Sequence, residues 1–108
     1  MTDRAILFAE WFGVGPAAAR VCSTLYEAQG AVVPFPALMA AGRQGRNGLN
    51  LSIKRLRAAM DPGSIGNVHG RGFYMTEIGL ADCHAALRDA FARACEAAAV
   101  RASGRNAA

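Results

Sequence analysis

Residues 47–60 predict a helix with two different faces, and this helix constrains the fold more than any other stretch. An apolar stripe repeats at spacings of four, three and four residues: Leu49, Ile53, Leu56 and Met60. This spacing places the stripe on one side of an α-helix, so that side belongs in a hydrophobic core. A leucine and two cations fall on roughly the opposite side, in the set Leu51, Lys54, Arg55 and Ala58. The basic side therefore needs an explanation other than core packing.

Positive charge is concentrated around this helix. The chain has a net charge of +4, and residues 43–71 contain six basic residues and one acidic residue, a balance of 6 − 1 = +5. The rest of the chain contains six basic and seven acidic residues, a balance of −1, and no acidic residue lies between Ala28 and Met60. A basic block on a near-neutral body favours a polyanion bound at one face. The alternative is a solvated, arginine-rich surface.

Length and composition limit the class of protein. A chain of 108 residues predicts one domain, and its apolar runs are far shorter than the ~18 residues of a membrane span. We therefore expect no membrane partner, and the first residues do not predict a signal peptide. The chain has an odd number of cysteines, and their spacing does not suggest disulfide pairs: Cys22, Cys83 and Cys95. This pattern indicates reduced thiols and a cytoplasmic location.

The order of predicted elements is mainly helical, with a small β-hairpin, which is an α+β fold class. A helix is expected over residues 2–12, followed by a second from Pro16 that ends at Gly30. "AVVPFP" predicts a short β-type stretch, "PALMAAG" a brief helix and "GRQGRNG" a basic turn before the helix over residues 47–60. "IGNV", "HGRG" and "FYMT" predict a hairpin, and a last helix is expected from Thr76 or Gly79 to about Arg101.

Three strings in this order resemble the winged helix-turn-helix DNA-binding domain of OmpR/PhoB-type response regulators, here without a receiver domain. "LNLSIKRLRAAM" is similar to that family's recognition helix, "NVHGRGFYM" to its wing, and "GPAAARVCSTLYEAQGAVVPFPALM" to its first helix and the entry to its second. The resemblance covers residues 14–76. It implies a single winged-helix domain over residues 1–102, in which extra helices over residues 2–12 and 79–101 flank the winged core. Residues 103–108 are expected to form a frayed tail.

The chain also departs from the family's pattern. The helix over residues 2–12 stands in place of the family's N-terminal sheet, and a long helix follows the wing, where the family normally ends. Pro34 stands where a capping serine or threonine is common, and His69 where the wing usually has arginine.

The predicted recognition helix, residues 47–60, would read bases in the major groove of DNA. Leu51 can meet a thymine methyl group, and Arg55 can contact a guanine through two hydrogen bonds. The resemblance implies the same base-facing role for Leu51 and Arg55. Asn47, Ser52 and Lys54 lie near enough to share this role. The alternative for Leu51 is a second core contact against the first helix.

Phosphate contacts are expected from Arg43, Arg46 and Arg57, and the resemblance implies this role for Arg57. The wing, residues 68–74, carries Arg71 between two glycines, where it can enter the adjacent minor groove or touch phosphates. His69 is a lesser wing candidate. The alternative is a plain hairpin tip whose arginine and histidine are solvated.

We therefore expect a non-enzymatic, sequence-specific regulator of transcription that binds double-stranded DNA without a cofactor. "DCH" at residues 82–84 suggests a metal site, but helix neighbours point about 100° apart, so we expect no metal there. The alternative function is a protein-interaction module that binds an acidic partner such as a transcription protein. We also expect the helices over residues 2–12 and 79–101 to pack together and to form part of a homodimer; the rival expectation is a monomer.

Overall fold

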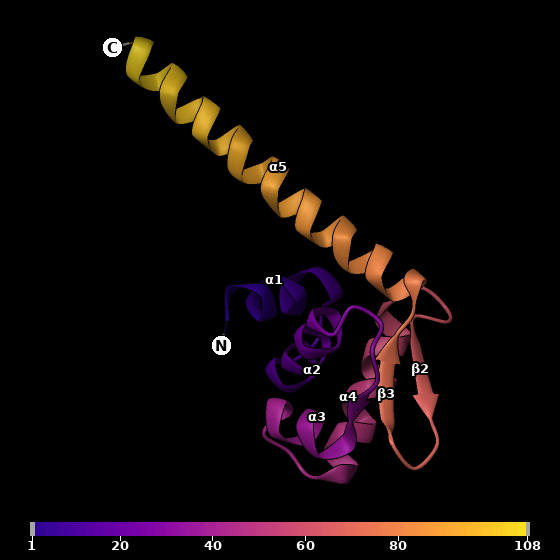
Figure 1. The fold of residues 1–108 in the computed structure, drawn as a ribbon. Coiled ribbons are helices and arrows are strands. Elements are labelled where there is room, and N and C mark those ends of the chain that lie inside the picture. Colours follow the sequence, from indigo (N-terminus) through magenta and orange to yellow (C-terminus); the bar gives the residue numbers. More distant parts are fainter. Residues whose placement is uncertain (1, 108) are drawn as a thin grey trace.

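A computed structural model describes residues 2–107 of the chain (Figure 1). Over these residues the chain is mainly helical and has one small antiparallel sheet, so the predicted α+β class is confirmed. The elements follow in the order α1 (Asp3–Phe12), α2 (Pro16–Glu27), β1 (Val33–Pro34), α3 (Phe35–Gly42), α4 (Arg46–Ala59), β2 (Ile65–Val68), β3 (Gly72–Met75) and α5 (Glu77–Ala107).

Capping and turn residues set the end of the first helix and the starts of the first two helices. Thr2 caps α1 with its side-chain oxygen, which accepts a hydrogen bond from the backbone N–H of Ala5 at 3.3 Å. Gly13 ends α1 in a left-handed conformation with φ of 66°, and Pro16 occupies the first turn of α2. The chain therefore turns sharply between two adjacent helices.

Helix α5 runs further than the sequence predicted. It continues to Ala107 rather than ending near Arg101, so residues 103–107 of the expected tail are described as helical. This stretch contains no proline, and its single glycine costs a helix only about 1 kcal/mol relative to alanine. Local sequence therefore gives the helix no strong reason to end at residue 101.

The sheet joins the predicted hairpin to the short strand before α3. Strand β3 lies between β1 and β2, and both pairs are antiparallel, with Val33 opposite Phe73 and Gly66 opposite Tyr74. Gly70 forms the hairpin turn with a positive φ of 74°. Gly72 has a different role, because a Cβ at this position would collide with the carbonyl of Val33. The absence of that side chain lets β1 approach β3.

The core lies between α2, α3, α4 and the sheet. The stripe predicted on α4 faces it, and Leu49, Ile53 and Leu56 are almost fully buried. Other elements supply the remaining large buried side chains, which include Phe8, Val21, Leu25, Leu38 and Met75. The buried face of the helix over residues 47–60 is thereby confirmed.

The two flanking helices pack together, as expected. Helix α1 lies across α2 and contacts α5. The first part of α5 covers the body through the buried Cys83 and Ala86, and the second part projects beyond it (Figure 1). The molecule is therefore elongated, with a longest extent of 62 Å.

No single helix within the described residues is long and apolar enough to cross a membrane. Helices α1 and α2 taken together meet that criterion, but the two are bent by 113° at their junction.

The close approach of β1 to β3 can be tested at Gly72. We expect Gly72→Ala to lower the free energy of unfolding by about 1–3 kcal/mol, because the new Cβ would push against backbone rather than a flexible side chain. The matched control is Gly45→Ala, where the space around the backbone is open and the expected loss is below about 1 kcal/mol. Equal losses in urea unfolding would contradict this role.

Candidate nucleic-acid interface

Helix α4 presents a continuous exposed face opposite its buried stripe. Its exposed side chains are Arg46, Asn47, Asn50, Leu51, Lys54, Arg55, Arg57, Ala58 and Ala59. Leu51 is 45% exposed, so it makes no second core contact, and the alternative proposed for it from sequence is wrong. An exposed leucine among cations is the unusual feature of this face.

The turn between α3 and α4 fixes the orientation of this face. Arg43 ends α3 in a left-handed conformation with φ of 54°. Gln44 then folds its side chain over two glycines, and a Cβ at either Gly42 or Gly48 would come within 2.7 Å of the Gln44 amide group. The same amide oxygen accepts a hydrogen bond from the hydroxyl of Ser52 at 2.7 Å. Gln44 therefore connects the end of α3 to the second turn of α4.

Ser52 is a correction to the predicted base-contacting set. It is only 4% exposed, and its hydroxyl is used by Gln44. The physical reason is helical phase, because Ser52 follows Leu49 by three residues and precedes Leu56 by four. It therefore lies on the inner side of α4 and cannot reach a partner on the outer side.

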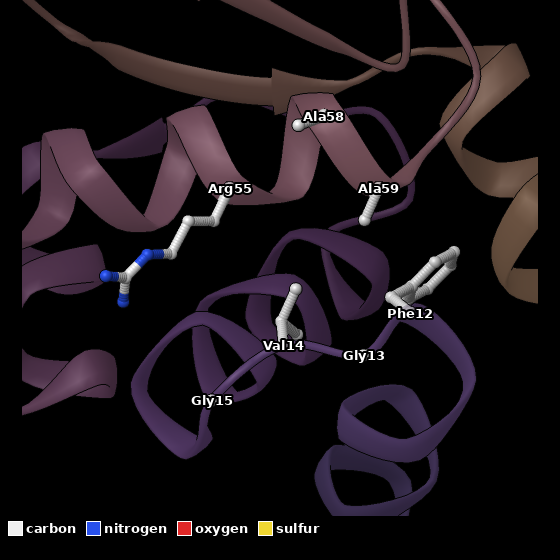
Figure 2. A pocket seen from close by; sticks show the side chains of 7 residues that line it. All are labelled: Phe12, Gly13, Val14, Gly15, Arg55, Ala58 and Ala59. Atoms are coloured by element: carbon white, nitrogen blue, oxygen red, sulfur yellow. The ribbon is translucent and has the colours of Figure 1, made fainter.

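Arg55 lies at one edge of the exposed face. A shallow groove of about 470 Å³ separates α4 from the α1–α2 connection, and it is lined by Phe12, Gly13, Val14, Gly15, Arg55, Ala58 and Ala59. Figure 2 shows Phe12 at one end of this groove, and Arg55 extending from α4 at the other. No acidic side chain pairs with Arg55 among the described residues. Its guanidinium group is thus available to an external acceptor.

The other edge of the exposed face borders the hairpin. A second groove, of about 320 Å³, runs between α4 and the sheet and is lined by Asn50, Ile53, Lys54, Arg57, Asn67 and Phe73. Sequence reasoning missed Asn50 and Asn67. Asn50 precedes Lys54 by one helical turn, and Asn67 follows the buried Ile65 by two residues, which places it on the sheet face toward α4, so periodicity could have found both.

Two of the predicted phosphate-binding arginines also hold the fold together. Arg57 donates hydrogen bonds from Nε and Nη2 to the carbonyl oxygen of Ile65, at 3.3 and 3.1 Å. The guanidinium carbon of Arg46 lies 3.6 Å from the ring centre of Phe35, in a cation–π contact. Arg57 therefore fastens α4 to β2, and Arg46 fastens it to the start of α3.

The predicted wing residues lie at the β2–β3 turn, where His69 and Arg71 are both exposed. The backbone of Arg71 connects this turn to the helices, because its carbonyl accepts a hydrogen bond from Phe35 N–H at 3.1 Å. Figure 1 shows the β2–β3 turn and α3 at the end of the body away from α5. Arg43, the last residue of the predicted set, is exposed directly after α3.

The thiols of the chain lie apart from this face. Sγ of Cys22 and Sγ of Cys83 are 3.9 Å apart in the core, and their hydrogen bond together with burial raises the pKa of Cys22. Such a thiol is a poor nucleophile. His84 packs edge-on against Tyr26, with ring centres 5.5 Å apart. Among residues 2–107, no three His, Cys, Asp or Glu side chains form a cluster that could hold a metal.

The fastening role of Arg57 predicts a loss of stability. We expect Arg57→Ala to lower the free energy of unfolding by about 1 kcal/mol, because it removes two charge-assisted hydrogen bonds. Arg57→Lys should lose part of this stability, since an ammonium group lacks the forked geometry. Lys54→Ala is the matched control, with an expected change within about 0.5 kcal/mol. Urea unfolding compares the three, and an Arg57→Ala variant as stable as Lys54→Ala would contradict the assignment.

Comparison of the chain with protein-family models, with curated proteins and with solved structures found no match. Any assignment of function therefore depends on the chemistry and geometry of the residues described above.

Proposed function

We propose that this protein is a non-enzymatic, cytoplasmic regulator of transcription that binds double-stranded DNA with sequence specificity. Helix α4 acts as the recognition helix, and the β2–β3 hairpin acts as the wing. The observation that supports this most strongly is the outer face of α4. There, an exposed leucine lies among unpaired cations, in a segment that contains no acidic residue from Ala28 to Met60.

The side chains on this face match the chemistry of the major groove, which is wide enough for an α-helix. The methyl groups of Leu51 can pack on a thymine methyl group, and the amide of Asn47 can pair with adenine. Arg55 can donate two hydrogen bonds to guanine, while Lys54 can reach a neighbouring acceptor. Together these residues offer both apolar and polar readout of base edges.

Residues around this face supply the contacts that position a helix on DNA. Arg43 lies before the N-terminus of α4, and Arg71 lies at the tip of the hairpin beside it. Such cations neutralise phosphates and set the orientation of the helix without reading sequence. Arg46 and Arg57 can add to this charge, although both also contact the protein itself.

The arrangement of elements supports a winged helix-turn-helix of the OmpR/PhoB type. Two consecutive helices, α3 and α4, are joined by a short turn, and an antiparallel hairpin follows them. Strand β1 pairs with β3 and so connects the hairpin to the entry of α3. This order is the one that the resemblance implies for residues 14–76.

A second candidate function is the binding of an acidic protein surface, such as that of a transcription protein. The groove beside Arg55 favours it, because its walls include the apolar Phe12 and Val14 and could receive an apolar side chain. The two candidate functions differ in what the protein binds. The DNA-binding function predicts that the protein alone prefers some duplexes over others, whereas the alternative predicts no preference among duplexes.

Selection of bound sequences from a pool of random duplexes tests the proposal directly. We expect enrichment of a short motif, and binding of the selected duplex should fall steeply as salt rises. Binding of all duplexes with equal affinity would contradict sequence specificity, and no duplex binding at low salt would contradict the proposal as a whole.

Arg55→Ala should remove sequence preference more than overall binding. Losing a guanine contact should cost ~1–3 kcal/mol at one base position and little on scrambled duplexes. The matched control is Arg88→Ala, an exposed arginine on α5, which should change neither. Titrations of selected and scrambled duplexes measure the difference, and a variant with undiminished preference would show that Arg55 does not read bases.

Arg71→Ala should weaken binding to all duplexes by similar factors, because a phosphate contact carries no sequence information. The slope of log K against log salt should become shallower by about 0.9, the value of one phosphate contact on duplex DNA. Arg71 is a cleaner test than Arg57, whose side chain also stabilises the fold. An unchanged slope would argue against a wing contact.

A further inference from the structure

Helix α5 has an unpartnered apolar face beyond the body. Residues 91–103 are all exposed, and Phe91 is 73% exposed. Phe91 shares one side of the helix with small apolar residues one and two turns later, Cys95 and Ala98. Helices in proteins gain most of their stability from packing such a face, and this segment contains no buried residue within the described chain.

We propose that the projecting half of α5 pairs antiparallel with α5 of a second copy of this chain. The two-fold axis passes beside Cys95, and the far end of each α5 docks against α1 of the other copy. In this register residue i faces residue 190 − i, because 95 + 95 = 190. Phe91 then faces Ala99, a large side chain against a small one.

The receiving surface is a pocket between α1 and α5. It has a volume of about 360 Å³ and is lined by Asp3, Ile6, Leu7, Glu10, Ala90 and Arg93. Ile6 and Leu7 make it partly apolar. Its two carboxylates, Asp3 and Glu10, outnumber its one cation, Arg93, which already pairs with Asp89 at 2.8 Å, so the pocket is acidic. Asp3 and Glu10 take part in no ion pair within residues 2–107. The pocket therefore suits a basic side chain beside an apolar one.

Arg101 supplies the complementary charge. The side of α5 that faces the body contains Gly79, Cys83, Ala86 and Ala90, and the same side continues as Ala94, Ala97 and Arg101. The two-fold axis is perpendicular to both helices, so this side of α5 points in the same direction in the two copies. Arg101 of one copy thus arrives beside Glu10 of the other. On its own helix it lies 11 residues, or about 16.5 Å, beyond Ala90.

A second copy fits this surface because both halves of the interface lie on one chain. The projecting face and the acidic pocket are adjacent on α5, and the same contact occurs twice about the axis, as a two-fold interface requires. The dimer does not depend on the proposed DNA binding. If that function holds, residue 85 of the two copies would lie 20 residues apart along the pair, or about 30 Å, close to one turn of DNA.

Sedimentation without DNA tests the dimer. We expect a dimer at micromolar concentration, and Phe91→Glu should raise the dissociation constant by at least about tenfold because it places charge in the apolar interface. Phe91 is exposed, so this variant should remain folded, which circular dichroism verifies. Val32→Glu, at a similarly exposed apolar residue before β1, is the matched control and should remain dimeric. A monomeric wild type, or equal effects of both variants, would overturn the proposal.

Two further variants test the register. A thiol-specific bismaleimide should link two wild-type chains through Cys95, since Cys22 and Cys83 are buried, and Cys95→Ser should stay dimeric but unlinked. Arg101→Glu should weaken the dimer several-fold, and adding Glu10→Arg should restore it. Restoration identifies the antiparallel arrangement, because parallel helices would not bring Arg101 to α1. Failure of the charge swap to restore the dimer would overturn this docking.

Discussion

Burial of Leu49, Ile53 and Leu56 decides where every other side chain of α4 lies. Because a helix turns 100° per residue, fixing these three in the core sends Leu51 and Lys54 outward. Gln44 fixes the same phase from the other end, through its contact with Ser52 and its fit over two glycines. The outer face of α4 is therefore held rigidly, which is a condition for reading a specific sequence.

The arginines around this face divide into two groups. Arg46 and Arg57 contact the protein itself, one through the ring of Phe35 and the other through the carbonyl of Ile65. Arg55 and Arg71 have exposed side chains with no partner among the described residues. Substitutions in the first group would change stability and binding together, so the second group gives the clearer information on what the face binds.

The sequence predicted the elements and the two faces of α4 because these depend on local periodicity. It placed the hairpin strand over residues 65–68 and the exposure of Leu51 correctly. It failed for Ser52, whose polarity suggested the outer face although its phase places it inside. The roles of Gln44 and Arg57 depend on groups brought together by the fold, such as the Ile65 carbonyl, and no local pattern reports such contacts. The extension of α5 was missed because a single glycine is a weak stop signal.

The central claim is tested most directly by NMR. A selected duplex is added to the protein, and the change in chemical shift is measured for each backbone amide. If the outer face of α4 and the hairpin tip bind DNA, the largest changes will fall at residues 46–55 and 69–71. The α1–α5 pocket, which shares no lining residue with this face, should change little. Changes concentrated in that pocket, or no change on adding duplex, would contradict the account.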